Sequence, residues 1–101
     1  MKKIINGKKY DTDTAECVGH DSFGCRGDFR YWFEQLYQKQ TGEFFIYGEG
    51  GPFTKYGKTC TDSAKAFGEN IYPLTIVEAQ EWVERHLSTE DYEDIFGEVS
   101  E

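Results

Sequence analysis

The sequence TIVEAQEWVERHLS (residues 75–88) has the clearest hydrophobic periodicity in the chain and predicts an amphipathic helix. Thr75 followed by Glu78 is a capping-box pair, which marks the start of the helix. At about 100° per residue, the apolar side chains gather on one arc and the glutamates on the other. The apolar arc contains Ile76, Ala79, Trp82, Val83, His86 and Leu87. The Trp82 side of this helix is therefore expected to pack against a sheet.

A second, shorter helix is predicted immediately downstream. Ser88 is a favourable N-cap residue, and TEDYEDIFGE follows it. Tyr92, Ile95 and Phe96 are expected to face inward, while the acids face solvent. Two of the acids fall in the first turn, where the helix dipole favours negative charge.

The formal charge of −8 is concentrated in this helical region. Residues 78–101 contain nine acids and one base, whereas residues 1–77 contain ten of each. Such an asymmetry repels DNA, RNA and acidic membranes, and it attracts basic surfaces.

Toward the N-terminus, the sequence predicts the first strands of a sheet. Asn6-Gly7 is a strong hairpin signal and joins expected strands near residues 2–5 and 8–11. Residues 13–19 predict a short helix, begun by Asp or Thr and ended by glycine. Residues 20–28, HDSFGCRGD, are rich in Gly, Ser and Asp and predict a loop.

An aromatic-rich segment predicts a second hairpin. Thr41-Gly42 is expected to turn the chain between arms at residues 33–40 and 43–47. The first arm alternates imperfectly, because Phe33 and Leu36 fall on opposite faces of a strand. A helical turn within that arm is therefore the alternative.

A glycine-rich segment follows this hairpin and predicts a long irregular connection. Its glycines are Gly48, Gly50, Gly51, Gly57 and Gly68. A phosphate-binding loop is the functional alternative, but Glu49 adds negative charge, Pro52 removes a backbone donor, and no P-loop motif is matched. The glycines are instead expected to supply positive φ angles in turns. NIYPLT (residues 70–75) then predicts a short edge strand closed by Pro73.

Together these elements predict one α+β domain over residues 1–101. In it, a small antiparallel sheet of hairpins packs against one amphipathic helix plus a short C-terminal helix. No signal peptide or membrane-spanning apolar run is recognisable. Three cysteines at irregular spacing do not fit a disulfide framework. We therefore expect a cytoplasmic protein with reduced thiols.

Few side chains point to catalysis or metal binding. The spacing C-x2-H-x4-C with a distant fourth thiol predicts, as an alternative, a zinc site at Cys17, His20, Cys25 and Cys60. Paired C-x-x-C motifs are missing, however, so no metal or other cofactor is expected. His20 and His86 are the only imidazole bases, and the sequence names no third residue that would orient either one. The expected protein is not an enzyme.

Four segments of the chain resemble a family of small proteins of bacterial phages and mobile elements. They are Lys8–Ala15, Leu36–Phe45, Gly50–Tyr56 and Pro73–Trp82. Some small acidic mobile-element proteins of this kind are similar to anti-CRISPR inhibitors, which bind a Cas effector and prevent it from using DNA. The resemblance implies a stoichiometric inhibitor that acts in the cytoplasm of a bacterial host cell.

The charge distribution and the resemblance lead to one hypothesis of function. A rigid acidic surface imitates a nucleic-acid backbone and occupies the basic groove of a protein partner, such as a Cas effector. The residues expected to bind the partner are Glu78, Glu81, Glu84, Glu90, Asp91, Glu93 and Asp94. The alternative is a small acidic interaction or regulatory module of unknown target, whose acidity serves solubility.

Direct binding to nucleic acid is not expected, although four lysines lie within the first nine residues. Asp11 and Asp13 follow these lysines at once, and the acidic helices belong to the same small domain. A phosphate binder usually has a larger basic stripe. Membrane binding is not expected either.

Overall fold

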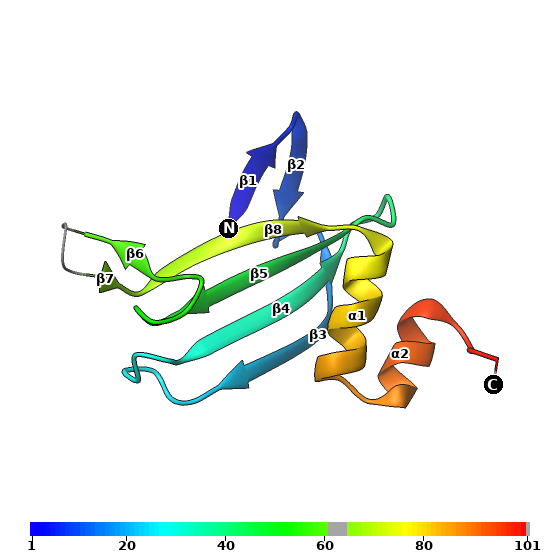
Figure 1. Cartoon of the computed structure of the whole chain (residues 1–101). Coiled ribbons are helices and arrows are strands. Elements are labelled where there is room, and N and C mark those ends of the chain that lie inside the picture. The colour runs from blue at the N-terminus through cyan, green and yellow to red at the C-terminus, as the bar shows by residue number, and fades with distance from the viewer. Residues whose placement is uncertain (61–64, 101) are drawn as a thin grey trace.

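A four-stranded antiparallel sheet lies at the centre of the computed structural model, which describes residues 1–60 and 65–100 (Figure 1). In spatial order, its strands are β3 (Glu16–Phe23), β4 (Trp32–Gln38), β5 (Phe44–Gly50) and β8 (Gly68–Leu74). The remaining strands form two separate two-stranded antiparallel sheets. One pairs β1 (Lys2–Ile5) with β2 (Lys8–Asp11), and the other pairs β6 (Lys58–Thr59) with β7 (Lys65–Ala66). The helices are α1 (Ile76–His86) and α2 (Thr89–Phe96). The predicted α+β class is confirmed, and neither described helix is long and apolar enough to cross a membrane.

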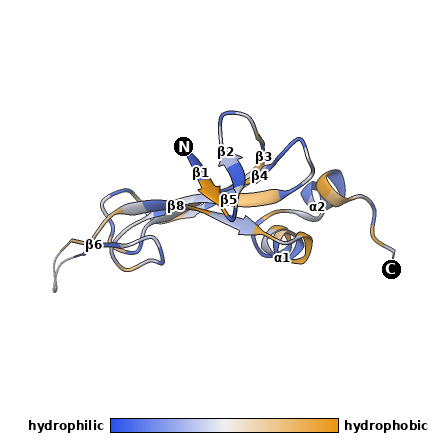
Figure 2. Cartoon of the chain, turned by 90° about the horizontal axis from the view of Figure 1, so that it is seen from above, coloured by the Kyte–Doolittle hydropathy of each residue, from blue (hydrophilic) through white to orange (hydrophobic). Residues whose placement is uncertain are grey.

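The central sheet carries apolar side chains on both faces. On one face, residues of the sheet and of α1 form a cluster of Leu36, Phe44, Ile46, Ala79, Trp82 and Val83. On the other face, β2 and the sheet form a second cluster of Tyr10, Tyr37, Phe45 and Ile71. Figure 2 shows the N-terminal hairpin and α1 on opposite sides of the sheet. Because each face has its own apolar layer, Phe33 and Leu36 point in opposite directions within an intact strand, and the helical alternative is wrong.

The two predicted hairpins and the edge strand are confirmed, but the first hairpin forms a separate two-stranded sheet instead of joining the main one as expected. Asn6 and Gly7 have φ angles of 52° and 78°, the left-handed values that a tight two-residue hairpin turn requires. β4 and β5 are joined by a turn in which Gly42 has a φ angle of 94°. β8 pairs only with β5 in the sheet, and Pro73 is tolerated there because an edge strand does not need every backbone N–H for pairing.

Both helices begin at the predicted N-cap residues, α1 with the predicted capping box and α2 with one that was not predicted. The Thr75 hydroxyl accepts a hydrogen bond from the Glu78 amide (3.1 Å), and the Glu78 carboxylate accepts one from the Thr75 amide (2.9 Å). Ser88 and Asp91 repeat this arrangement at α2, with distances of 3.1 and 3.4 Å. These bonds satisfy backbone N–H groups that have no partner within the helix.

The residues that the two helices turn toward the sheet are the predicted ones, with one exception. Ala79, Trp82 and Val83 of α1 are buried, and α2 adds the half-buried Tyr92, Ile95 and Phe96 to the same cluster. Ile76 was also expected on the apolar arc, but its side chain is 53% exposed. The buried stripe of α1 therefore begins one turn later than the periodicity predicts.

The helix predicted over residues 13–19 is wrong, and so is the first part of the loop predicted over residues 20–28. The chain makes only one turn after β2, in which the Ala15 amide donates to the Asp11 carbonyl oxygen (3.1 Å). It then continues as β3, which pairs antiparallel with β4 from Glu16 to Phe23, with one bulge between Cys17 and Gly19. A short helix gains little on its own, whereas β3 covers the otherwise open edge of β4. Long-range pairing therefore overrides the weak local helix signal.

The five glycines of residues 48–69 have a different role from the predicted one. Positive φ angles occur at other glycines, namely Gly7, Gly24, Gly27, Gly42 and Gly97. A Cβ on Gly48 would overlap the Tyr56 ring, and a Cβ on Gly51 would lie 2.6 Å from the Phe29 carbonyl oxygen. The absence of side chains thus lets residues 51–57 fold back closely over the sheet. The irregular connection predicted over residues 48–69 is shorter than expected, because residues 48–50 belong to β5, residues 68–69 belong to β8, and β6 and β7 lie between them. Residues 61–64 of the predicted connection lie outside the described residues.

Substituting Gly48→Ala is expected to destabilise the fold by about 1–3 kcal/mol, because the new methyl group forces β5 or the Tyr56 ring to move. Tyr56 has little freedom to move, since it is buried and its hydroxyl donates to Glu34. Urea unfolding measures the loss. In a Tyr56→Ala background the same substitution should cost clearly less, because the space is then empty. An equal cost in both backgrounds would contradict the packing explanation.

Candidate functional site

The seven acids predicted to bind a partner lie on the two helices. They are Glu78, Glu81 and Glu84 of α1 and Glu90, Asp91, Glu93 and Asp94 of α2, and we call them the acidic surface. Six are exposed and Glu93 is half-buried. None of the seven forms a salt bridge within residues 1–60 and 65–100. Their charge is therefore not neutralised by the described part of the domain.

The acidic surface extends over two neighbouring elements. On α1 the acids are spaced three residues apart, so that they lie next to one another along the helix. On α2, Glu90 and Asp94 are related in the same way by four residues. Figure 1 shows the two helices together at one end of the sheet, and they contact each other. The structure thus brings the predicted acids of both helices to the same end of the molecule.

Two members of the acidic surface also stabilise the helices. The carboxylates of Glu78 and Asp91 accept the backbone amides of the capping boxes. Glu81, Glu84 and Asp94 are exposed and lie outside these boxes. These three residues are therefore the most direct probes of partner binding, because their replacement leaves both caps intact.

A buried carboxylate joins the helix, the sheet and residues 51–57. Glu34 of β4 is 6% exposed. Its Oε1 accepts a hydrogen bond from the Trp82 indole (3.0 Å) and its Oε2 accepts one from the Tyr56 hydroxyl, and the Lys55 ammonium lies 2.9 Å from the same Oε2. Donors from α1 and from residues 55–56 thus satisfy one charge in the sheet, as burial of a carboxylate requires.

These contacts determine the protonation states of Glu34 and Tyr56 at neutral pH. Burial opposes the ionisation of Glu34, but hydrogen bonds from Tyr56, Trp82 and Lys55 outweigh it and hold the pKa of Glu34 below its usual range. Burial and the hydrogen bond to Glu34 raise the pKa of Tyr56 far above its usual value. At neutral pH, Glu34 is therefore ionised and Tyr56 is a neutral hydrogen-bond donor.

The free energy of unfolding is expected to fall as the pH drops below about 4, the ordinary range of glutamate pKa values. Because the pKa of Glu34 is lower in the folded protein, its contribution is complete above the unfolded pKa and is lost as the pH falls through the folded one. Denaturant unfolding at a series of pH values measures this decline. The free energy of unfolding of a Glu34→Gln variant should decline less over the same pH range. Part of the decline should remain, since hydrogen bonds from His86 and Lys8 lower the pKa of Asp21 and of Glu43. An identical decline in the variant would contradict this assignment.

The two histidines have separate surroundings. His86 lies at the end of α1, where its Nδ1 is 2.8 Å from an Asp21 carboxylate oxygen. Its ring packs against the rings of Trp82 and Trp32, with centroid distances of 4.7 and 5.6 Å. His20 lies instead near Phe33, at a centroid distance of 6.3 Å. Asp21 thus orients His86, a contact that joins residues 65 positions apart and that the sequence did not reveal.

The four residues of the zinc alternative do not converge. Cys17 lies at the start of β3, Cys25 lies beyond its end, and both are exposed, as is Cys60. An extended strand keeps its two ends far apart. In the part of the chain that the structure describes, which includes all four residues, no group of three potential metal ligands occurs. The spacing that suggested a metal site therefore does not become a metal-binding geometry.

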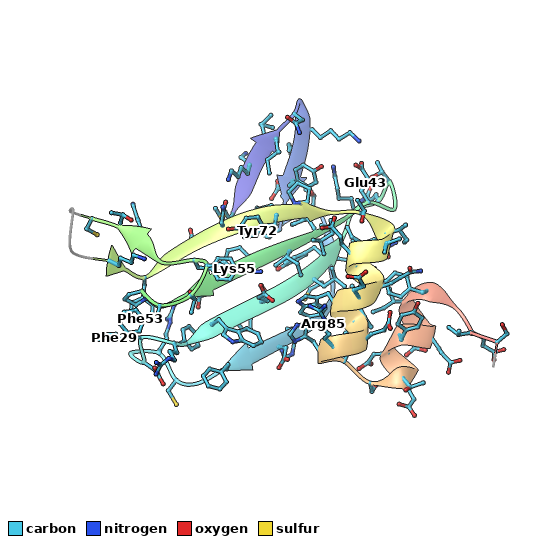
Figure 3. The ribbon with its side chains drawn as sticks, in the orientation of Figure 1. Phe29, Glu43, Phe53, Lys55, Tyr72 and Arg85 are labelled. Atoms are coloured by element: carbon cyan, nitrogen blue, oxygen red, sulfur yellow. The ribbon has the colours of Figure 1, made fainter. Side chains whose placement is uncertain are left out.

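A groove of about 510 Å³ separates the end of α1 from residues 51–57. Its lining includes Phe23, Arg30, Trp32, Phe53, Lys55 and His86. Figure 3 shows Lys55 over the sheet, with Phe53 and Phe29 at the end of the sheet away from the helices. The groove and the Glu34 centre were not predicted. The available signal was Glu34 itself, the one charged residue within YWFEQLY.

Comparisons of the chain with protein-family models, with curated proteins and with solved structures find no match. The function of the acidic surface and of the groove is therefore inferred from the charge, exposure and contacts of their residues.

Proposed function

We propose that this protein is a stoichiometric, non-catalytic inhibitor whose acidic surface occupies the basic nucleic-acid-binding groove of a protein partner. The observation that carries the proposal is the lack of any salt bridge to the seven helical acids among the described residues. Basic grooves bind nucleic acid largely through its phosphate charges. A row of carboxylates presents charge of the same sign to such a groove.

The acidic surface is supported by a rigid base, which favours binding. Trp82 is buried beneath α1 and donates to Glu34 of the sheet. Both helices start at hydrogen-bonded caps. Side chains presented by elements that are ordered before binding lose less conformational entropy when the complex forms.

The resemblance to small proteins of phages and mobile elements suggests the class of partner. Such proteins act inside a bacterial cell, where a Cas effector offers a basic channel for DNA. The negative field of the helices would steer the protein toward that channel and speed association. A Cas effector is therefore the first partner to test.

The direct test is competition for the groove. A purified effector is loaded with labelled target DNA, and the protein is added in increasing amounts. We expect DNA to be displaced near one equivalent of protein. Stable binding of DNA and protein to the same effector would contradict the proposal. As a control without effector, the protein alone should not retard duplex DNA or single-stranded RNA in a gel at micromolar concentration.

A second candidate is an acidic interaction or regulatory module whose charge serves solubility and helix stability. The capping roles of Glu78 and Asp91 favour it, because they give two of the seven acids a structural purpose. This candidate predicts that a partner captured from lysate stays bound when Glu81, Glu84 and Asp94 are neutralised. The inhibitor predicts that the partner is lost.

A further inference from the structure

The groove between α1 and residues 51–57 presents hydrogen-bond donors that the described part of the chain does not use up. Lys55 contacts Glu34, yet its side chain remains 62% exposed, and an ammonium has three N–H donors. Arg30 lines the same groove and forms no salt bridge to any described residue. The acid at the floor, Glu34, is already engaged by three donors. The polar side of the groove therefore favours an anionic ligand.

Aromatic rings form most of the rest of the groove. Phe23 and Phe53 are 54% and 66% exposed, although large aromatic side chains usually gain stability from burial. Phe53 is held in place by Phe29, which meets it edge-on at a centroid distance of 5.4 Å. Trp32 adds an indole that is itself supported by His86. Exposed rings that are fixed by their neighbours provide ready faces for a planar ligand.

From these two features we propose that the groove binds a planar aromatic ring that carries an anionic group, and that its ligand is a nucleoside monophosphate. Phe53 and Trp32 supply apolar contacts for the base, while Arg30 and Lys55 supply donors for the phosphate. A volume of about 510 Å³ lies within the range of small-molecule sites, about 300–1,000 Å³. The proposal is independent of the acidic surface and of the proposed partner.

The distribution of charge favours a single nucleotide over a strand. Figure 3 shows Phe53 at the far end of the sheet from α1 and α2. Salt screens exposed charges beyond about 8 Å under physiological conditions, so the acidic helices affect a small ligand only weakly at the Phe53 end of the groove, whereas His86 of α1 lines the other end. A longer strand would bring many phosphates near the helices, where they are repelled.

The test is titration of the whole protein with adenosine monophosphate, followed by amide NMR shifts. Saturable binding is expected with a dissociation constant of about 1 mM or lower, and adenosine alone or phosphate alone should bind more weakly. A short single-stranded oligonucleotide should bind no more tightly than the monophosphate. Three results would each overturn the proposal: an oligonucleotide that binds much more tightly than the monophosphate, phosphate alone that binds as tightly as the monophosphate, or the absence of any saturable shift.

Two exposed residues allow a matched comparison. Phe53→Ser and Arg30→Ser should each weaken adenosine monophosphate binding about tenfold, the scale of losing a stacking or charged contact. Phe67→Ser and Arg26→Ser are the controls, because both residues lie at a different hollow and should leave the affinity unchanged. Equal effects of the two pairs would overturn the assignment. All four side chains are exposed, so the variants are expected to fold, and amide spectra verify this.

Discussion

Replacing Glu34 by alanine is expected to lower the free energy of unfolding by about 3–5 kcal/mol, the usual cost of removing one partner of a buried ionic contact. The substitution leaves the Tyr56 hydroxyl and the Trp82 indole without their acceptor, and it leaves Lys55 without its counter-charge. It also removes a group that connects α1 and residues 55–56 to the same strand. The loss should therefore be the largest of any single substitution considered for this protein.

Urea unfolding monitored by tryptophan fluorescence measures this loss. The matched control is Glu84→Ala, which removes an exposed glutamate of α1 and should change stability by no more than about 0.5 kcal/mol. The stability loss of Glu34→Gln should lie between those of the other two variants, because glutamine retains one acceptor oxygen but replaces the other with a donor. A Glu34→Ala variant as stable as Glu84→Ala would show that the buried network contributes nothing.

Reversing three charges of the acidic surface is expected to abolish partner binding. In Glu81→Lys/Glu84→Lys/Asp94→Lys, each substitution adds two units of charge, so that the formal net charge changes from −8 to −2. A basic groove that attracts the native surface would then meet like charge, which costs several kcal/mol at an interface. Asp91 is left unchanged because its carboxylate caps α2.

A second triple variant separates local charge from net charge. Asp13→Lys/Glu16→Lys/Glu98→Lys reaches the same net charge by reversing exposed acids outside the two helices. We expect this variant to bind the effector and to displace DNA nearly as well as the native protein. Both triple variants should unfold cooperatively near the native midpoint. Equal loss of binding in the two would show that the helices are not the contact surface.

The parts of the fold that were predictable are those that neighbouring residues determine. The capping box at Thr75 and the N-cap at Ser88 depend on contacts three residues apart, and the Asn6-Gly7 turn depends on two φ angles. β3 was missed because its conformation is set by pairing with β4, which no local pattern encodes. The glycines of residues 48–69 were assigned the wrong purpose for the same reason, since their close contacts come from residues that return to the sheet.

The same distinction between local and long-range contacts holds for the candidate site. The acidic surface was predictable because charge position follows directly from helix periodicity. The Glu34 centre was not, because it requires Trp82, Tyr56 and Lys55 to meet a residue that is more than 20 positions away from each. The groove likewise exists only when residues 51–57 lie opposite the end of α1. Long-range sites of this kind become visible only in the folded chain.

The salt dependence of partner binding tests the central claim most directly. Exposed charges in an interface are screened as ionic strength rises, and contacts that replace phosphates in a basic groove should share the strong salt dependence of nucleic-acid binding. The measurement is the affinity of the native protein for the purified effector at a series of salt concentrations between about 0.05 and 0.5 M. We predict that the logarithm of the affinity falls steeply and linearly with the logarithm of salt concentration, and that the Glu81/Glu84/Asp94 charge-reversal variant shows no measurable affinity at any concentration in the series. An affinity that stays constant across the series would contradict binding through the acidic surface.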